Sequence, residues 1–295
     1  MSKKILGEKH VVVAVVEVNN SNPNGDKEAH GAPRQDGATG LGLITDVCIK
    51  SKFLEAVREM YGDVELFIEA NRALNEKFEE AAREAAGMTV AELVNAMKKD
   101  RDAFTPVLQY LLERYFDMRT FGAVLAKLNR HVRGPAQFTI AQSVLPVELK
   151  TYALTSQGIT TDKQFYEEGS NTMFGEKTVV RHGVYVIRGE VSAVQAEQTG
   201  FTEDDMEKLL QGMVHMFDFD KAAGRADMRL RGLWDFVYPD RLGLEPTTTT
   251  LWESLKVTPV PEVLNGFRPA TEFSDYIVSL DEASIPSNIT IRKLV

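Results

Sequence analysis

Residues 11–26 of the chain are VVVAVVEVNNSNPNGD. The first half, residues 11–18, is an almost unbroken run of β-branched and apolar side chains, which is typical of a β-strand buried on both faces. The second half, residues 19–26, contains only Asn, Ser, Pro, Gly and Asp. A buried strand that ends in so many small polar residues leads either into an ordinary turn or onto a surface that contacts a polar ligand.

The bulk composition predicts a soluble protein. The chain has 295 residues, of which 43% are hydrophobic and 26% are charged, so we expect one large domain or a core domain carrying an inserted one. No apolar run reaches the roughly 18 residues of a membrane helix. Glu8, Lys9 and His10 interrupt the apolar N-terminal pattern, which favours a first strand over a signal peptide. With Cys48 as the single cysteine, neither an intrachain disulfide nor a thiolate zinc cluster can form. We expect a cytoplasmic protein without membrane contact.

Charge is unevenly distributed along the chain. The net charge of −9 argues against a free nucleic-acid binder, which is usually basic. However, residues 60–116 carry 11 acidic and 7 basic side chains, whereas residues 117–190 carry 7 acidic and 9 basic ones. The two segments therefore have net charges of −4 and +2. A local basic face on an acidic body is compatible with this distribution.

Hydrophobic periodicity and turn residues predict the order of elements. After the strand at 11–18, residues 19–43 form a long loop, and Thr45 or Asp46 begins a helix that extends to residue 60. Two or three helices are predicted within 66–116, one of them with Thr105 as its cap and Pro106 as its first residue. The remaining predictions are strands within 136–154, an extended hairpin or arm at 155–180, a strand at 183–193, a helix at 202–217, and strands at 233–239, 275–280 and 289–294. This order suits a β-α-β-β-α-β core with large insertions.

No catalytic motif is present. The five histidines form no close ligand pair, and neither a GxSxG elbow nor a Walker loop occurs. The glycines of GATGLGLITD, residues 37–46, are spaced G-x-x-G-x-G, which is not the dinucleotide pattern. Asp26, Asp36 and Asp46 are candidate metal ligands of a nuclease, although turn and cap roles explain Asp26 and Asp46 equally well.

Several cations fall at positions that suit an anionic ligand. Lys50 and Lys52 lie in the first turns of the predicted 45–60 helix, where they oppose the helix dipole but favour a phosphate. Arg119 and Arg133 lie near glycines that allow close approach of a ligand, and Gln137 adds a neutral donor. Solvated surface side chains are the alternative interpretation.

The segment NTMFGEKTVVRHG, residues 171–183, combines an apolar pair with cations. Met173 and Phe174 stand among polar residues and glycines, and Lys177, Arg181 and His182 follow. An apolar tip on a basic arm can wedge between bases or stack on them. The alternative is that Met173 and Phe174 pack in a core or on a partner.

Six segments occur in an order that resembles a known family: NSNPNGD, APRQD, TDVCIK, FDMRTFGAVL, VRGPAQFTIAQSV and AEQTGF. Over residues 11–240 the chain is similar to the repeating backbone subunit of type I CRISPR interference complexes (Cascade), closest to subtype I-C. The resemblance implies an α+β fold. It comprises an RRM-like, ferredoxin-type palm in residues 1–59 and 117–295, a β-hairpin thumb at about 150–180, and a helical fingers insertion at 60–116.

The resemblance also implies a function. Identical copies would oligomerise along one CRISPR RNA (crRNA) as a helical filament, hold the guide by sequence-independent backbone contacts, and present it for pairing with target DNA. Other partners would be the large subunit and the subunit that binds the crRNA 5′ handle. No catalysis, cofactor or metal is implied. The residues expected to contact RNA are Asn22, Asn24, Lys50, Lys52, Arg119, Arg133, Gln137, Met173, Phe174, Lys177, Arg181 and His182.

Two other functions remain open at this point. Related backbone subunits of type III complexes cleave RNA with an acidic residue, so a metal-dependent ribonuclease would use Asp26 or Asp46. A structural module without bound RNA is compatible with Glu176, which stands where relatives typically have a cation. Residues after about 245 do not match the family pattern.

Overall fold

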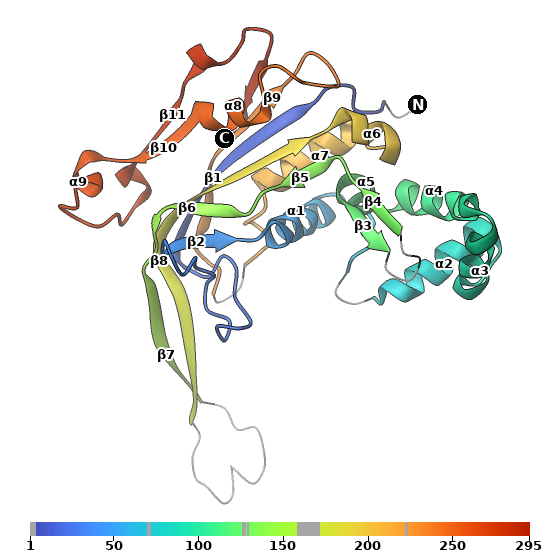
Figure 1. Ribbon diagram of the computed structural model, residues 1–295. Coiled ribbons are helices and arrows are strands. Elements are labelled where there is room, and N and C mark those ends of the chain that lie inside the picture. Colours follow the sequence, from blue (N-terminus) through green and yellow to red (C-terminus); the bar gives the residue numbers. More distant parts are fainter. Residues whose placement is uncertain (1–3, 70–71, 126–127, 129, 158–171, 222–223) are drawn as a thin grey trace, which may run out of the picture.

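A mixed α+β architecture is built around an antiparallel sheet (Figure 1). The computed structural model describes residues 4–69, 72–125, 128, 130–157, 172–221 and 224–295. Within these residues the main sheet has eight strands: β1 (His10–Ser21), β2 (Leu41–Ile44), β5 (Ala136–Phe138), β6 (Ala141–Pro146), β7 (Leu149–Gln157), β8 (Thr172–Val191), β9 (Met228–Val237) and β12 (Thr290–Lys293).

The centre of the sheet has the order β9-β1-β8-β6, with every neighbouring pair antiparallel. In chain order, helix α1 (Asp46–Met60) comes after β1 and β2. Helices α6 (Ala193–Thr199) and α7 (Glu203–Val214) connect β8 to β9. This is the β-α-β-β-α-β arrangement of a ferredoxin-type fold. The predicted fold class is therefore confirmed.

Strand β1 is buried on both faces, as its valine run predicts. Val12, Ala14 and Val16 belong to the hydrophobic core that includes side chains of α1 and α7. Because successive side chains of a strand point to opposite faces, Val11 and Val13 belong to a second core on the other side.

The C-terminal segment supplies that second core. It contains α8 (Thr248–Ser254), β10 (Leu255–Pro259), α9 (Pro261–Leu264) and β11 (Tyr276–Leu280), and its chain then joins the sheet as β12. Leu251, Leu255 and Tyr276 pack with Trp234 and Phe236 of β9. The residues after about 245, which did not match the family pattern, therefore cover one face of the sheet. The strands predicted at 275–280 and 289–294 are confirmed as β11 and β12.

Side-chain caps begin the two helices that lie on the first core. The Thr45 Oγ1 atom accepts a hydrogen bond of 3.3 Å from the Cys48 N–H at the start of α1. Thr202 and Asp205 form a reciprocal capping box at the start of α7. That helix ends at Val214, three residues before the predicted end. No helix of the described residues is long and apolar enough to cross a membrane.

Three helices with a separate core extend from the palm-like sheet (Figure 1). They are α2 (Leu74–Ala86), α3 (Val90–Lys99) and α4 (Thr105–Arg114), and their core includes Phe78, Leu93, Val107 and Leu111. We call α2–α4 the helical block. Thr105 is the first residue of α4 rather than its cap, because the cap position falls on Phe104. The division into palm, fingers and thumb remains a prediction.

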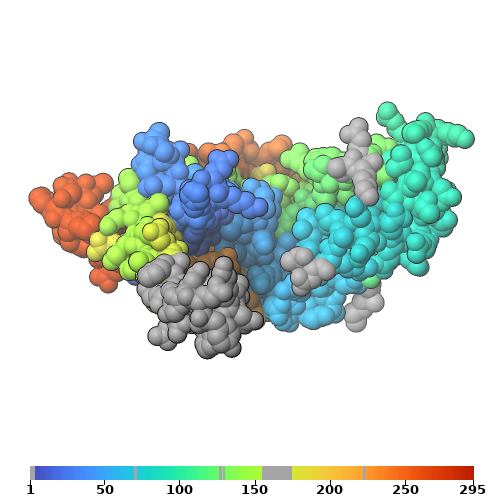
Figure 2. Space-filling model, turned by 90° about the horizontal axis from the view of Figure 1, so that it is seen from below, coloured from blue at the N-terminus to red at the C-terminus, as the bar shows by residue number. Residues whose placement is uncertain are grey.

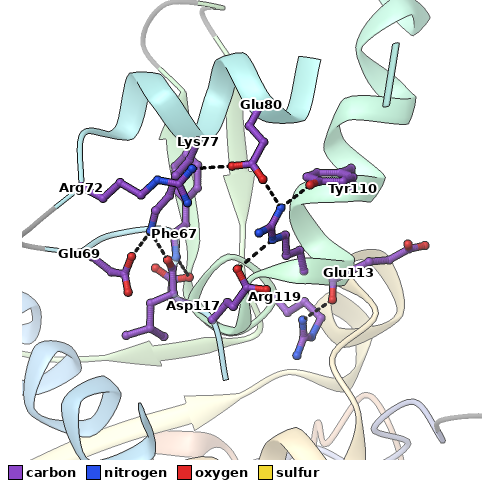
Figure 3. Close-up of polar contacts among 12 residues, drawn as sticks. Phe67, Glu69, Arg72, Lys77, Glu80, Tyr110, Glu113, Asp117 and Arg119 are labelled. Carbon is purple, nitrogen blue, oxygen red and sulfur yellow. Dashed lines mark hydrogen bonds and ion pairs between the residues drawn. The ribbon is translucent and has the colours of Figure 1, made fainter. Parts of the chain in front are cut away.

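Polar contacts hold the segment that precedes α2 in place (Figure 3). Asp117, on the short helix α5 (Phe116–Phe121), accepts hydrogen bonds from the N–H groups of Phe67 at 2.6 Å and Ile68 at 2.8 Å. Burial raises the pKa of Asp117 above its usual range, although these donors favour the ionised form. The buried Lys77 ammonium contacts the Glu69 carboxylate. The strands β3 (Gly122–Leu125) and β4 (Arg130–Arg133) follow α5 as an antiparallel pair.

Strands β7 and β8 form an arm that projects from the body (Figure 1). They pair from Leu149↔Val180 at the root to Gln157↔Thr172 at the far end. The described part of the arm thus agrees with the expected extended hairpin. Residues 158–171, and the side chains of 155–157 and 172–174, lie outside the described structure.

Candidate nucleic-acid interface

The loop that follows β1 folds back on itself. Gly25 and Pro33 form an antiparallel bridge, and the Arg34 N–H donates to the Asn24 carbonyl at 2.9 Å. His30 has a φ of 52°, a left-handed conformation that is uncommon outside glycine. The opening motif is therefore a compact loop with an ordered backbone.

The two asparagines of this loop have different roles. The Asn24 Oδ1 atom accepts from the Thr45 N–H at 2.9 Å and so fixes the loop to the start of α1. The Asn22 Nδ2 atom donates to the Gly31 carbonyl at 2.7 Å. The Asn22 Oδ1 atom is buried without a partner among the described residues. An unsatisfied buried acceptor of this kind is rare in folded proteins, which makes Asn22 an unusual position of the loop.

A cavity of about 430 Å³ lies between this loop and the root of the arm. Asn22 and residues 29–32 form one wall, and Glu176, Lys177 and Thr178 of β8 form the other. Figure 2 shows the face on which the loop, in blue, lies beside the arm root, in yellow-green, while the helical block occupies the other end of the molecule. The predicted residues Asn22 and Lys177 therefore lie at one site.

The two lysines of α1 lie in different environments. The Lys50 ammonium contacts the Asp46 carboxylate at 3.0 Å and lines a cavity of about 610 Å³ between α1 and β3–β4. Lys52 is buried and forms an ion pair with Asp220, which also contacts Arg225 at 3.1 Å. Lys52 is an internal residue, so Lys50 is the accessible one.

Arg119 is also internal. Its guanidinium contacts the buried Asp205 carboxylate at 2.9 Å and donates to the Leu112 carbonyl. It also donates to the Glu113 carbonyl (Figure 3). Burial alone would raise the pKa of Asp205, but the contacts from Arg119 and Thr202 hold that pKa below its usual value. This ion pair links α5 to α7.

Arg133 and Gln137 lie on two different short strands, β4 and β5, and β5 pairs with β8 in the main sheet. Arg133 is exposed at the end of β4. Gln137, on β5, donates from Nε2 to the Gly134 carbonyl at 3.0 Å. Neither lines the cavity at the arm root. If they bind RNA, they do so at a second position.

Arg181 and His182 are neighbours on β8 with opposite exposure. The Arg181 guanidinium is exposed and contacts Glu148 at 3.0 Å. His182 is buried, and its Nδ1 atom lies 2.6 Å from the Asn19 Oδ1 atom. Burial lowers the pKa of His182, so the ring is neutral at physiological pH. A neutral, buried ring does not provide a cation for phosphate.

The apolar pair expected at the thumb is described only by its backbone. Phe174 pairs with Thr155 and Met173 pairs with Ser156 in the β7–β8 hairpin. Their side chains lie outside the described residues. A wedge role for them therefore remains a prediction.

Sequence reasoning missed four polar residues near the arm root. They are Lys150 and Tyr152 of β7 and Arg229 and Arg231 of β9. Lys150 and the two arginines line one groove together with Arg181. Strand register, which the sequence does not specify, brings them together. The one available signal was Glu17, because a single carboxylate inside a valine run requires a buried cationic partner.

The candidate acidic residues do not gather at one place. Asp26 contacts Arg34 at 3.0 Å, and Asp46 contacts Lys50. Asp36 accepts from Thr39, and these hydrogen bonds lower the pKa of Asp36. In the described part of the chain, no group of three His, Cys, Asp or Glu residues is arranged to hold a metal ion.

A family model described as CRISPR-associated protein Cas7 matches residues 8–281. The match spans the helical block, most of the C-terminal segment and every strand of the main sheet except β12. The chain belongs to the CRISPR-associated protein Cas7 family. The family resemblance seen in the sequence is therefore confirmed at this level, and the subtype remains a prediction.

The chain is also similar to a curated protein and to a solved structure. The CRISPR-associated protein Cas7 of Haloferax volcanii is 21% identical over 215 residues, which is 66% of this chain and 60% of that relative. The alignment thus spans less than two thirds of the curated relative. A chain in a solved structure named "CRISPR RNA-guided surveillance complex, pre-nicking" has a TM-score of 0.51 and 15% identity, with 79% of each chain covered. At this identity the second likeness shows the fold alone.

Proposed function

We propose that this Cas7 family member is a non-catalytic backbone subunit of a type I CRISPR interference complex, closest to subtype I-C. Identical copies bind along one crRNA as a helical filament and present the guide for pairing with target DNA. The large subunit and the 5′-handle-binding subunit complete the assembly. Family membership and the shape of the arm root support this proposal.

The cavity between the loop and the arm root is the observation that carries the proposal. Lys177 supplies a cation on one wall, and Asn22 and the backbone of residues 29–32 supply polar groups on the other. An RNA backbone offers the matching groups, a phosphate and a ribose 2′-hydroxyl. Three of the four residues at 29–32 are Ala or Gly, and these small side chains allow the RNA backbone to approach. Such a site holds a guide of any sequence.

Exposure divides the candidate RNA contacts into two groups. The proposed interface uses accessible side chains, namely Asn22, Lys50, Arg133, Lys177 and Arg181. Lys52, Arg119 and His182 are internal, and Asn24 orients the loop. Gln137, Met173 and Phe174 stay in the proposal on the family resemblance alone.

Among the residues that the structure describes, no observation favours the ribonuclease alternative. Asp26 and Asp46 each form an ion pair with a neighbouring cation. Magnesium-dependent cleavage of bound RNA that is abolished by Asp26→Asn would nevertheless replace the proposed function with this alternative.

Replacing Lys177 with Gln is expected to weaken binding to mixed-sequence single-stranded RNA and to lower its salt dependence. An RNA phosphate that the protein no longer contacts keeps its counterion. The slope of log Kobs against log salt should therefore decrease in magnitude by about 0.7 for one lost phosphate contact. Fluorescence anisotropy with a labelled oligonucleotide between 50 and 200 mM salt measures both quantities.

The matched control is Lys256→Gln, on the exposed side of β10 and away from the cavity. It removes the same charge, so any effect of net charge alone appears in both variants. An equal slope for the two variants would remove Lys177 from the interface.

A further inference from the structure

An apolar tip projects from the C-terminal segment. It consists of α9 and the turn after it, residues 261–270, which we call the C-terminal knob (Figure 1). Phe267 is 80% exposed, the highest fraction of any large apolar side chain in the described part of the chain, and Leu264 is also exposed. Because aromatic side chains contribute strongly to the energetics of protein interfaces, Phe267 is a candidate anchor for a partner.

Hydrogen bonds fix the backbone of the knob. The Gly266 N–H donates to the Val263 carbonyl at 3.0 Å, and the Phe267 N–H donates to the Glu262 carbonyl at 2.9 Å. With the φ of 75° at Gly266, these are the two bonds of a Schellman motif. An apolar residue at the position of Phe267 frequently packs back on the helix in this motif, but here the ring is exposed. The turn therefore presents an aromatic ring on an ordered backbone.

A groove with an apolar lining lies between α1 and the β3–β4 pair. It is the cavity of about 610 Å³ that Lys50 lines. The β-branched side chains of Val47, Ile68 and Val124 line it and are largely exposed. Further apolar lining comes from Leu54, Leu66, Phe121, Ala123 and Val132. Within the described residues of one copy, this apolar surface is left open to solvent.

The charged residues of this groove do not favour a polyanion. Its acidic residues, Glu55, Glu69 and Asp117, outnumber its lysine and arginine, Lys50 and Arg58. An apolar groove with charges of both signs at its edge instead resembles a protein interface, which has an apolar core and a polar rim. Lys50 can still contact RNA, because a lysine stem packs along apolar surface while its ammonium stays in water.

The knob and the groove lie in different parts of the molecule (Figure 1). Helix α9 is at one end, whereas α1, β3 and β4 lie toward the helical block. A contact between the knob of one copy and the groove of another therefore joins two different surfaces. Such a heterologous contact leaves one knob and one groove free on every pair, so that further copies can add as an open helix.

We propose that the C-terminal knob of one copy docks in the groove between α1 and β3–β4 of the next copy. Leu264 and Phe267 enter the groove and pack on its exposed apolar side chains. A second copy is the partner because both halves of the contact are present on this chain. The inference rests on the proposed function and extends it, because it names the surfaces through which neighbours meet. The family resemblance of the sequence ends at about residue 240, before the knob.

Thiol crosslinking of the full chain tests this contact. Cys48 is the single cysteine, so Cys48→Ser provides a background without thiols. Into it we place Phe267→Cys in the knob and Val124→Cys in the groove, and we add a short bifunctional maleimide with and without mixed-sequence single-stranded RNA. We expect the double-cysteine chain to form a ladder of covalent multimers in at least one condition, and each single-cysteine chain to stay monomeric. Dimers of the Phe267→Cys chain alone would overturn the inference, because they would place two knobs together.

Leu264→Asp, compared with Leu244→Asp, tests whether apolar packing makes the contact. The two leucines are 67% and 70% exposed, and Leu244 belongs neither to the knob nor to the groove. In the double-cysteine chain, we expect Leu264→Asp to remove the ladder and Leu244→Asp to leave it unchanged. The absence of a ladder in both conditions, or equal ladders in the two variants, would overturn the inference.

RNA binding by the wild-type chain separates this inference from the proposed function. If no ladder forms but the wild type still binds the mixed-sequence RNA, the proposed function survives and the knob contact is overturned. A ladder that Leu264→Asp removes, in a protein that binds no RNA, would support the knob contact and contradict the proposed function.

Discussion

Replacing Gly122 with Ala is expected to lower the free energy of unfolding by about 4 kcal/mol or more. Gly122 joins α5 to β3 with φ 72° and ψ −172°, a conformation that is essentially restricted to glycine. An added Cβ atom would lie 2.1 Å from the Val132 carbonyl oxygen and 2.6 Å from the Gly134 nitrogen. Both neighbours are backbone atoms, one in β4 and one in the residue that follows it. Neither can move without disturbing the β3–β4 pairing.

Gly87→Ala is the matched control for this prediction. Gly87 ends α2 with φ 64°, and an added Cβ atom would have no neighbour within 4 Å. The cost is then the left-handed conformation alone, about 1–2 kcal/mol. Urea denaturation of the two variants separates the effects. Equal losses would show that the contact around Gly122 is not as close as described.

Replacing Arg231 with Met is expected to destabilise the protein by about 3 kcal/mol at neutral pH, because it leaves a buried carboxylate without its cation. The Glu17 side chain is 3% exposed, and Arg231 forms its ion pair. Asn19 and His182 still contact Glu17 in this variant. The loss of stability is therefore expected at the lower end of the range for a broken buried ion pair. The double variant Glu17→Gln/Arg231→Met should recover part of the loss.

The pH dependence of this variant has a defined sign. Burial alone would raise the pKa of Glu17, but hydrogen bonds from Asn19 and Arg231 lower it in the native protein. Ionised Glu17 therefore stabilises the wild type above the unfolded pKa of about 4.3, and this contribution is lost as pH falls through the lowered folded pKa. Without Arg231, burial dominates and the folded pKa rises.

The stability difference between Arg231→Met and wild type should thus be largest at neutral pH and should narrow as pH falls toward 4. Urea denaturation at several pH values measures this difference. A difference that stays constant over this range would contradict an ionic role for the pair.

Local signals accounted for the elements that the sequence predicted well. The valine run of β1 indicated burial on both faces, and Thr45 and Thr202 marked the starts of α1 and α7 because their side chains cap the adjacent helix. Thr105 was assigned as a cap but lies inside α4. A threonine before proline carries no information about the turn that precedes it, and here a short 3₁₀ helix leads directly into α4.

The candidate site was less predictable, because burial and long-range partners decide it. Lys52 and Arg119 resemble accessible cations in the sequence, yet their partners Asp220 and Asp205 lie 168 and 86 residues further along the chain. Conversely, Lys150 and Arg229 carried no motif. Strand pairing places them beside Arg181, and nothing local to either residue indicates that register.

We propose that this Cas7 family member lines a guide RNA together with identical neighbours. The most direct test of this proposal is to coexpress the full chain with its own CRISPR array, purify the chain, and measure the mass of the assembly and the sequence of any retained RNA. The account predicts a helical assembly in which several copies hold one crRNA, whatever its spacer sequence. A well-folded monomer that retains no crRNA would contradict it.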